Sequence, residues 1–327
     1  MNVGIIGCGL IGKKRALALE NDDVLIACCD TNIELGQKFA DDFNCIFYKD
    51  YTDLLNSCDT IVVAVVNKYA KDIVKSALDQ NKNILVEKPM GRDFKESLEI
   101  LLSSKDKILK VGFNHRFHPA IWKAKELFDA GTIGKLMYIR GTYGHGGRPG
   151  MESEWRASKD LCGGGELLDQ GVHLIDLSRW FAGNITSVFG KVSTKFWDIK
   201  VEDTAFMLLQ TESGIDIQLN VSWTNWKNIF QFELFGTDGY LKINGLGGWY
   251  GTETLEIGIR KQEGGVPDVE KIEYQEDTSW TKEWQEFKAA IKVNRLPIGN
   301  GIDGGKANQI IDALYKSSEK NKIIEIK

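Results

Sequence analysis

The sequence lacks the features by which membrane-spanning and nucleic-acid-binding proteins are recognised. No apolar stretch reaches the roughly 20 residues that a helix needs to cross a bilayer, and the basic residues form no block. Lysines and arginines number 41 against 46 acidic residues, which leaves a net charge of −5. Neither nucleic acid nor an anionic membrane is therefore expected as the main partner. The chain also enters its first apolar run at once, which leaves no room for a signal peptide.

The sequence also lacks the spacing of common metal and disulfide motifs. His115 and His118 have an i, i+3 spacing that a metal could use, but the sequence offers no third convergent ligand, so no metal is expected. The cysteines form no C-x-x-C pair, and most lie in apolar runs. The simplest interpretation is buried free thiols in a reducing cytoplasm. The six cysteines are Cys8, Cys28, Cys29, Cys45, Cys58 and Cys162.

Length and hydrophobic patterning predict two domains in the α/β class. At 327 residues the chain exceeds what one core usually supports. Over 1–119, short apolar runs alternate with helical patterns, which predicts a doubly wound parallel sheet. Over 120–327, strand-like runs separated by tight turns, with one strong helix at 166–181, predict an α+β domain with a large, open, mostly antiparallel sheet. The expected strands lie at 3–6, 24–29, 45–47, 60–66, 83–87, 108–113, 136–143, 188–194, 205–209, 215–223, 229–235, 255–260 and 322–326.

Three glycines follow the first apolar run with the spacing of a dinucleotide-binding turn. Gly7, Gly9 and Gly12 form G-x-G-x-x-G between a strand-like run and a helical pattern. The first permits a tight turn, the second lets the backbone approach a pyrophosphate, and the third lets helix and strand pack closely. The helix N-terminus offers free N–H groups and a positive dipole end to the phosphates. Together with Leu10 and Ile11, these glycines are predicted to bind a dinucleotide cofactor.

An acidic residue closes the next apolar run. Asp30 lies 18 residues after Gly12, where a carboxylate can accept hydrogen bonds from the adenosine ribose hydroxyls. Such a carboxylate repels a 2′-phosphate, so the predicted cofactor is NAD rather than NADP. Asn32 and Lys38 lie nearby, and an amide or basic side chain there leaves accommodation of a phosphate open as the alternative.

The segment Glu87-Lys88-Pro89 follows an apolar run of the predicted parallel sheet. It is placed at the carboxyl edge of the sheet, where open α/β folds bind their ligands. A lysine at this edge can donate a hydrogen bond to a reacting oxygen or exchange a proton with it. The alternative is a solvated lysine at the end of a strand, and the local sequence favours neither interpretation.

A glycine run, Gly163-Gly164-Gly165, leads into a helical pattern that contains Asp169, His173 and Asp176. Asp169 and His173 are four residues apart and share one face of a helix, and Asp176 follows on the same side. An imidazole that a carboxylate holds in one tautomer is a natural proton acceptor. The alternative is a His–Asp pair on a helix surface without a function.

A polar loop carries further side chains suited to substrate recognition. Tyr143, His145 and Arg148 lie in a glycine-rich run after a predicted strand, and Trp155 and Arg156 follow. Either arginine is able to bind a phosphate or carboxylate through two hydrogen bonds. A surface loop with solvated arginines is the alternative.

Taken in chain order, these motifs resemble the Gfo/Idh/MocA family of glucose–fructose oxidoreductases and inositol dehydrogenases. The resemblance extends over essentially the whole chain. It implies an N-terminal Rossmann domain, a C-terminal α/β domain with a large open sheet, and NAD(P)-dependent oxidation or reduction of sugars, polyols and their derivatives. The matching motifs are the glycine turn, Glu87-Lys88-Pro89, Gly112-Phe-Asn114-x-Arg116-Phe and Asp169-x-x-x-His173-x-x-Asp176.

The resemblance also implies roles for individual residues. Lys88 and His173 are the expected catalytic pair, and Asp169 is expected to act in catalysis and in substrate binding. Many relatives have Thr-Pro-Asn and a histidine after the fourth strand, whereas this chain retains only the asparagine, Asn67, in its segment 65–70. The remaining expected cofactor-binding residues are Val65, Asn67, Glu87 and Lys88. The remaining expected substrate-binding residues are Asn114, Arg116, His118, Tyr143, His145, Arg148, Trp155 and Arg156.

The prediction is thus a cytoplasmic, NAD-dependent oxidoreductase that acts on a carbohydrate hydroxyl or ketone. A nucleotide-linked, phosphorylated or otherwise modified sugar fits the arginines of the loop and is slightly preferred, because a free sugar or inositol fits its glycines almost as well. Two alternatives stay open: an enzyme that keeps NAD bound through a redox-neutral reaction, such as an epimerase or lyase, and a non-catalytic NAD-binding regulator.

The aromatic residues of the second half bear on assembly. Successive side chains of a strand point to opposite faces, so one face of the sheet is expected to remain apolar and uncovered. This pattern, with the family resemblance, predicts a homodimer or homotetramer through the C-terminal sheet. The alternative is that the aromatic side chains fill a single core. Among these aromatic residues are Trp197, Trp223, Trp226, Phe230 and Phe232.

Overall fold

The computed structural model describes residues 1–104 and 107–326, and their contacts define two compact units. The first unit comprises Met1–Asn114, Asp160–Gly163 and Trp280–Asn308. The second comprises His115–Lys159, Gly164–Ser279 and the residues from Gln309 onward. The expected fold class is confirmed, because the first unit holds a parallel sheet and the second a large, mostly antiparallel one.

The sheet of the first unit is parallel and has the doubly wound strand order β3-β2-β1-β4-β5-β6. Its central strands are apolar and buried on both faces, as parallel strands between helices must be. The strands are β1 (Asn2–Ile6), β2 (Val24–Cys29), β3 (Ile46–Tyr48), β4 (Thr60–Val63), β5 (Asn83–Val86) and β6 (Leu109–Val111). The helices between them are α1 (Leu10–Leu17), α2 (Ile33–Phe43), α3 (Tyr51–Leu55), α4 (Asn67–Asp79) and α5 (Phe94–Ser104).

A helix from the far end of the chain completes the core of the first unit. Trp284 and Phe287 of α9 (Ser279–Lys292) are buried together with Val3 and Ile5 of β1. The unit therefore differs from the expected segment 1–119, because the apolar face of α9 is buried in it. It also includes α7 (Lys159–Cys162).

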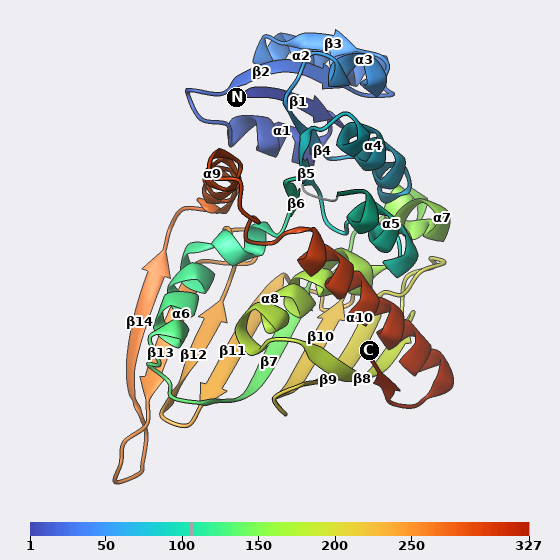
Figure 1. The fold of residues 1–327 in the computed structure, drawn as a ribbon. Helices are drawn as coiled ribbons and strands as arrows, with labels where there is room; N and C mark the ends of the chain where they lie inside the picture. The colour runs from blue at the N-terminus through green and yellow to red at the C-terminus, as the bar shows by residue number, and fades with distance from the viewer. Residues whose placement is uncertain (105–106, 327) are drawn as a thin grey trace. The chain divides into compact units, whose positions relative to one another are not determined.

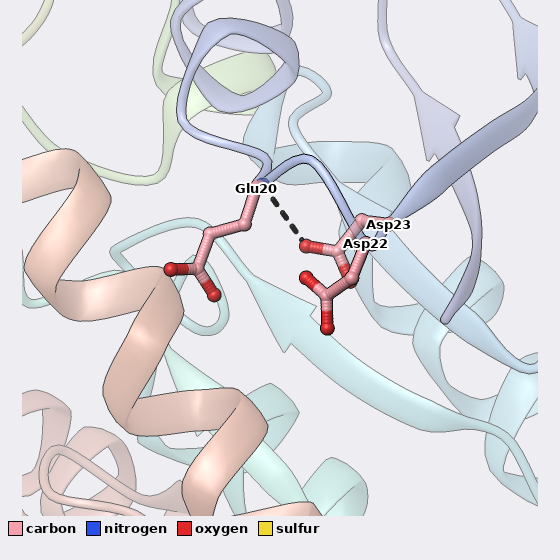
Figure 2. A group of neighbouring side chains, drawn as sticks. All are labelled: Glu20, Asp22 and Asp23. Carbon is pink, nitrogen blue, oxygen red and sulfur yellow. Dashed lines mark hydrogen bonds between the residues drawn. The ribbon is translucent and has the colours of Figure 1, made fainter.

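An acidic cluster fastens α9 within this unit. Figure 2 shows Glu20, Asp22 and Asp23 converging in the turn between α1 and β2. The ammonium of Lys288, on α9, forms ion pairs with all three carboxylates. Burial opposes the charge of this ammonium, but the hydrogen bonds to the carboxylates hold the pKa of Lys288 above its usual value. Trp284 donates its indole N–H to Asp23 at 2.7 Å, so the cluster fixes α9 by charge and by hydrogen bonding.

The sheet of the second unit has nine strands in the order β14-β13-β12-β11-β7-β10-β9-β8-β15. Its pairs are antiparallel except for β7 and β10, which run parallel. In Figure 1, α6 (Pro119–Asp129), α8 (Val172–Ala182) and the end of α10 (Gly301–Lys320) lie on one face of this sheet. The strands are β7 (Leu136–Gly144), β8 (Ile185–Ser193), β9 (Thr204–Thr211), β10 (Asp216–Ser222), β11 (Ile229–Gly236), β12 (Gly239–Asn244), β13 (Glu253–Ile259), β14 (Asp268–Tyr274) and β15 (Ile324–Glu325).

Strand alternation divides the aromatic residues of the second half between the core and the surface. Trp223, Phe230 and Phe232 are 1%, 2% and 0% exposed and lie in the core, whereas Trp226 is 62% exposed. The uncovered positions are held by other side chains, among them Phe206 and Leu208 of β9, which are 55% and 56% exposed. The cause is the two-residue period of a strand, which assigns neighbouring positions to opposite faces.

Candidate functional site

The glycine turn of the first unit has the geometry that a bound pyrophosphate requires. Gly7 adopts φ = +100°, and a Cβ there would lie 2.3 Å from the Ala64 carbonyl oxygen. A Cβ at Gly12 would lie 1.9 Å from the Gly7 carbonyl oxygen, so only glycine lets the helix approach the strand this closely. At Gly9, which precedes α1, a Cβ would meet none of the described atoms within 4 Å. The backbone at the helix N-terminus is thus open to a ligand, and these residues fit a dinucleotide.

Asp30 ties the glycine turn to the end of β2. Its carboxylate accepts the Cys8 N–H and the Asn32 N–H, both at 2.8 Å, one on each oxygen. Each carboxylate oxygen has a further lone pair for a hydroxyl donor. The side chain is half-buried at the edge of the sheet. The arrangement suits a ribose diol.

The Glu87-Lys88-Pro89 segment leaves β5 at the same edge, with a half-buried Lys88 and a cis Lys88–Pro89 peptide bond. Glu87 is directed to the interior, where it lies 2.6 Å from the guanidinium of Arg15. Burial raises the pKa of Glu87, although the Arg15 charge opposes this. The contact favours a structural role for Glu87, which fixes the strand end that carries Lys88.

The segment after β4 also forms contacts within the unit. Asn67 begins α4, is largely buried and donates its amide to the Cys162 carbonyl oxygen at 2.8 Å. Val65, just before it, is half-buried. The retained asparagine therefore holds α7, with one of its two amide N–H groups donated to the protein.

In the second unit, Asp169 lies on a π-helical turn, Leu167–Gly171, that continues directly into α8. The sequence predicted an α-helix here, and the structure differs by this wider turn, which is rare and frequent at functional sites. Glu202 anchors its start, because one carboxylate oxygen accepts the Leu167 N–H at 3.1 Å and the Tyr315 hydroxyl at 2.7 Å. The glycine run before it is required by close approach, since a Cβ at Gly165 would lie 1.9 Å from the Glu202 carbonyl oxygen.

His173 is buried in an aromatic and polar cluster. Its ring, 3% exposed, stacks on the ring of His115 with centroids 3.6 Å apart and planes 14° apart. The second ring nitrogen of His115, Nε2, lies 3.1 Å from the Tyr143 hydroxyl. Burial raises the pKa of Tyr143 well above its usual value, so this hydroxyl stays protonated. The stack fixes the plane of the His173 imidazole.

Two members of this cluster are not predicted from the sequence. The spacing of His115 to His118 points only to a metal, although its place between Asn114 and Arg116 is a further signal in the sequence. Tyr250 packs 5.0 Å from the Tyr143 ring and accepts a hydrogen bond from the Gln170 amide at 2.8 Å. Tyr250 lies 80 residues from Gln170 in sequence, so no local sequence pattern predicts this contact.

The arginines of the glycine-rich loop are already paired within the second unit. Arg148 lies 2.6 Å from Glu154, and Arg156 lies 3.4 Å from Asp169 and covers the ring of Trp155 at 4.5 Å. An anionic substrate group would therefore compete with carboxylates for both guanidinium groups. The Arg156 pair also orients the Asp169 carboxylate.

His145 follows the same loop into the site. Its Nδ1 accepts the Gly147 N–H at 2.9 Å, which leaves the proton of the neutral ring on Nε2. Burial is the largest cause that lowers the pKa of His145, and the Asp169 charge acts in the opposite direction. A neutral His145 with an N–H to donate suits recognition of a hydroxyl.

Two other predicted substrate ligands have partners in the protein interior. Arg116 forms two hydrogen bonds with the Asp176 carboxylate, at 2.6 and 2.8 Å. His118 lies 2.8 Å from a carboxylate oxygen of Glu253. Both side chains are 3% exposed. Asn114, at the end of the first unit, is buried as well. These contacts favour a positioning role for Arg116 and His118.

The predicted residues are thus divided between the units. The glycine turn, Asp30, Asn67 and Lys88 belong to the first unit, and the acid–base residues Asp169 and His173 to the second. In the part of the chain that the structure describes, the acidic, cysteine and histidine ligand atoms converge only at the cluster of Glu20, Asp22 and Asp23, which Lys288 occupies. Within residues 1–104 and 107–326, none of the helices is long and apolar enough to cross a membrane.

Sequence comparison gives the class and then the family. The profile described as an oxidoreductase family with an NAD-binding Rossmann fold matches residues 1–115, and that of the GFO/IDH/MocA C-terminal domain matches residues 121–242. The first match defines an NAD-binding oxidoreductase. Together the two matches show that the chain belongs to the GFO/IDH/MocA family, as the sequence motifs predicted.

Named relatives span most of the chain. Inositol 2-dehydrogenase/D-chiro-inositol 3-dehydrogenase of Lactiplantibacillus plantarum is 28% identical, covering 96% of this chain and 90% of that protein. Levoglucosan dehydrogenase of Pseudarthrobacter phenanthrenivorans is 27% identical over 75% of this chain and 73% of that protein. A solved structure of a levoglucosan dehydrogenase in complex with NADH matches with a TM-score of 0.92 and 22% identity, over 100% of this chain and 99% of that one. This structural likeness concerns the fold.

Proposed function

We propose that the protein transfers a hydride between NAD and a hydroxyl or ketone carbon of a neutral sugar or cyclic polyol. The observation that carries the proposal is the buried His173 imidazole, one helical turn after Asp169 and stacked on a second imidazole. Such an arrangement is suited to accepting a proton from a substrate hydroxyl. The names of the relatives, dehydrogenases of inositol and levoglucosan, support the same class of substrate.

Each proposed catalytic residue has one task. His173 accepts the hydroxyl proton during oxidation, while the His115 stack holds its ring. Lys88 donates a hydrogen bond to the same oxygen and stabilises the negative charge that develops on it. Asp169, oriented by Arg156, binds a neighbouring substrate hydroxyl. When bound, the nicotinamide supplies the hydride acceptor.

The charges of the loop favour a neutral substrate over a nucleotide-linked or phosphorylated one. Both of its arginines are ion-paired, Arg148 with Glu154 and Arg156 with Asp169. An anion would meet the negative charge of a carboxylate beside each guanidinium, whereas a neutral sugar hydroxyl can share the carboxylate and the His145 N–H without repulsion. A free sugar or inositol-type polyol is therefore the preferred proposal.

The proposal extends to cofactor choice, location and assembly. Asp30 disfavours a 2′-phosphate, so NAD is preferred over NADP. The protein is cytoplasmic, as its free thiols suggest. The uncovered sheet face with Phe206 and Leu208 supports a homodimer, or a dimer of dimers, because soluble monomers seldom expose a large apolar patch.

Turnover of the substrates named for the relatives tests the reaction. Inositol and levoglucosan, with D-xylose as a further neutral sugar, are each mixed with enzyme and NAD, and NADH absorbance is followed. His173→Ala and Lys88→Ala are expected to lower kcat by roughly 10²–10⁴-fold. Lys95→Ala, at an exposed lysine of α5, is the matched control and keeps native turnover. NAD affinity, measured by calorimetry, stays close to native in His173→Ala.

Two outcomes contradict the proposal. Near-native turnover of His173→Ala removes this residue from the proton path. Consumption of the substrate without net NADH, together with NAD that stays bound through gel filtration, identifies a redox-neutral enzyme instead.

A further inference from the structure

Three aromatic side chains form an exposed cluster on loops of the second unit. Phe196 and Trp226 are each 62% exposed, yet their rings lie edge to face with centroids 4.8 Å apart. Trp197 packs against the other edge of Phe196 at 5.2 Å. We call these three residues the aromatic platform. Grouped aromatic side chains on a surface mark a recognition site more often than single ones do.

Hydrogen bonds fix the backbone that carries Phe196 and Trp197, and also the indole of Trp197. The buried carboxylate of Asp203 accepts the backbone N–H groups of Lys195, Phe196 and Trp197 at 2.8, 2.8 and 3.1 Å. The indole N–H of Trp197 is donated to the Trp223 carbonyl oxygen at 3.0 Å. Rings that are ordered before binding lose little freedom when a ligand stacks on them. The platform is therefore preorganised.

The third ring is presented by an unusual backbone conformation. Trp226 adopts φ = +54°, a region that residues other than glycine rarely occupy. Such conformations persist where the surrounding structure enforces them and gather at ligand sites. Two glycines of the neighbouring loop make room, because a Cβ at Gly146 would lie 3.1 Å from the Trp226 Cα, and one at Gly147 would lie 2.5 Å from the Trp197 ring.

The platform is continuous with the candidate acid–base site of the same unit. The loop that packs against the two indoles also carries His145, whose backbone N–H is donated to the Ser222 carbonyl oxygen at 3.0 Å. The His145 carbonyl oxygen accepts the Asn225 N–H at 3.1 Å, one residue before Trp226. The charge of Asp169 counteracts the lowering of the His145 pKa that burial causes. The loop thus links the platform to His145, one of the residues proposed to recognise a substrate hydroxyl.

The aromatic rings of the platform suit a ligand ring with one apolar face. A pyranose or furanose ring presents such a face of C–H groups, which packs on aromatic rings while its hydroxyls stay in water. We propose that the aromatic platform is a subsite for a second, glycosidically linked neutral sugar ring. The substrate is accordingly a disaccharide or glycoside, and the inference rests on the proposed carbohydrate dehydrogenase function.

A comparison of matched substrates tests the subsite. The kcat/KM for NADH formation is measured with D-glucose, cellobiose, maltose and gentiobiose, and with D-xylose and xylobiose. The wild-type protein is expected to prefer at least one disaccharide over its own monosaccharide. Trp226→Ala and Phe196→Ala are expected to lower the ratio of the two kcat/KM values about tenfold, the worth of one lost stacking contact.

The control variant is Leu102→Ala, which removes a large apolar side chain, 70% exposed, from α5 of the first unit. Its ratio of disaccharide to monosaccharide kcat/KM is expected to stay native. Turnover of every monosaccharide with no preference for any disaccharide overturns the subsite and leaves the proposed function standing. A preference for UDP-glucose that Trp226→Ala abolishes overturns the neutral second ring, because a nucleobase then occupies the platform.

The absence of any turnover by the wild-type protein contradicts the proposed function itself. In that case, a binding measurement with disaccharides tests the platform independently of catalysis. Quenching of tryptophan fluorescence by cellobiose, maltose, gentiobiose or xylobiose, lost in Trp226→Ala, supports the subsite without catalysis. The lack of any such quenching overturns it.

Discussion

Replacement of Arg15 by methionine tests how the first unit fixes the strand end that carries Lys88. The Arg15 side chain is 1% exposed and lies 2.6 Å from Glu87 and 2.6 Å from Glu283. Methionine keeps much of the apolar volume and removes the charge. Lys110 remains 3.4 Å from Glu283, whereas Glu87 loses the guanidinium in a buried position.

The expected magnitude follows from burial rather than from distance. Removing one partner of a buried ion pair costs about 3–5 kcal/mol, because the other charge stays in the interior without compensation. An exposed pair contributes only about 0–1 kcal/mol. Arg148 provides a matched comparison, because it lies 2.6 Å from Glu154 and is 65% exposed. At about 2–4 °C per kcal/mol, Arg15→Met lowers Tm by roughly 6–20 °C, and Arg148→Met by at most about 4 °C.

Thermal unfolding followed by circular dichroism measures both variants under the same conditions. The Arg15 charge holds down the pKa of Glu87, which burial raises. In Arg15→Met, the folded-state pKa of this carboxyl therefore lies further above the unfolded value. A Glu87 carboxyl with a raised pKa stabilises the fold below its unfolded pKa, and this stabilisation is lost as the pH rises. The loss of Tm in Arg15→Met, relative to wild type, therefore grows from about pH 4 to pH 7. Equal losses of Tm in the two variants refute the reasoning.

Three further predictions concern the cofactor, a buried carboxyl and assembly. Asp30→Ala narrows the difference between the Kd values for NAD and NADP in calorimetry, and tighter NADP binding by the wild type contradicts the role of Asp30. Burial raises the pKa of Glu202, so the contribution of this carboxyl to the free energy of unfolding falls as the pH rises above about 4.5. Glu202→Gln therefore gains stability relative to wild type between about pH 4 and pH 7 in urea unfolding, and a pH-independent difference contradicts this. Leu208→Glu, at a 56% exposed position of β9, reduces the light-scattering mass to that of one 36.7 kDa chain; a wild type already at that mass excludes the oligomer.

The sequence by itself determined the features that depend on a few consecutive residues. The absence of a Cβ permits the positive φ of Gly7 and the close contact of Gly12 with the Gly7 carbonyl group. Both glycines can be read directly from the sequence. The strand–helix alternation over the first 114 residues and the doubly wound sheet follow from local apolar periods. The same apolar pattern places Asp30 at the end of the second strand, close to the glycine turn.

The tertiary structure alone decided the features that join distant positions. Arg15 meets Glu283 across 268 residues, and the apolar face of α9 joins a core that begins at Val3. No local pattern contains such a contact, because only the packing of the complete unit brings the segments together.

The same distinction separates the parts of the candidate site. The sequence predicts that Asp169 and His173 share a helix face. It does not predict the His115 stack or the ion pairs of Arg148 and Arg156. Which aromatic residues fill the core depended on strand register, since a shift of one residue exchanges the two faces of a strand. Register and long-range packing are collective properties of the folded chain, and they determine which of the readable residues are left to meet a ligand.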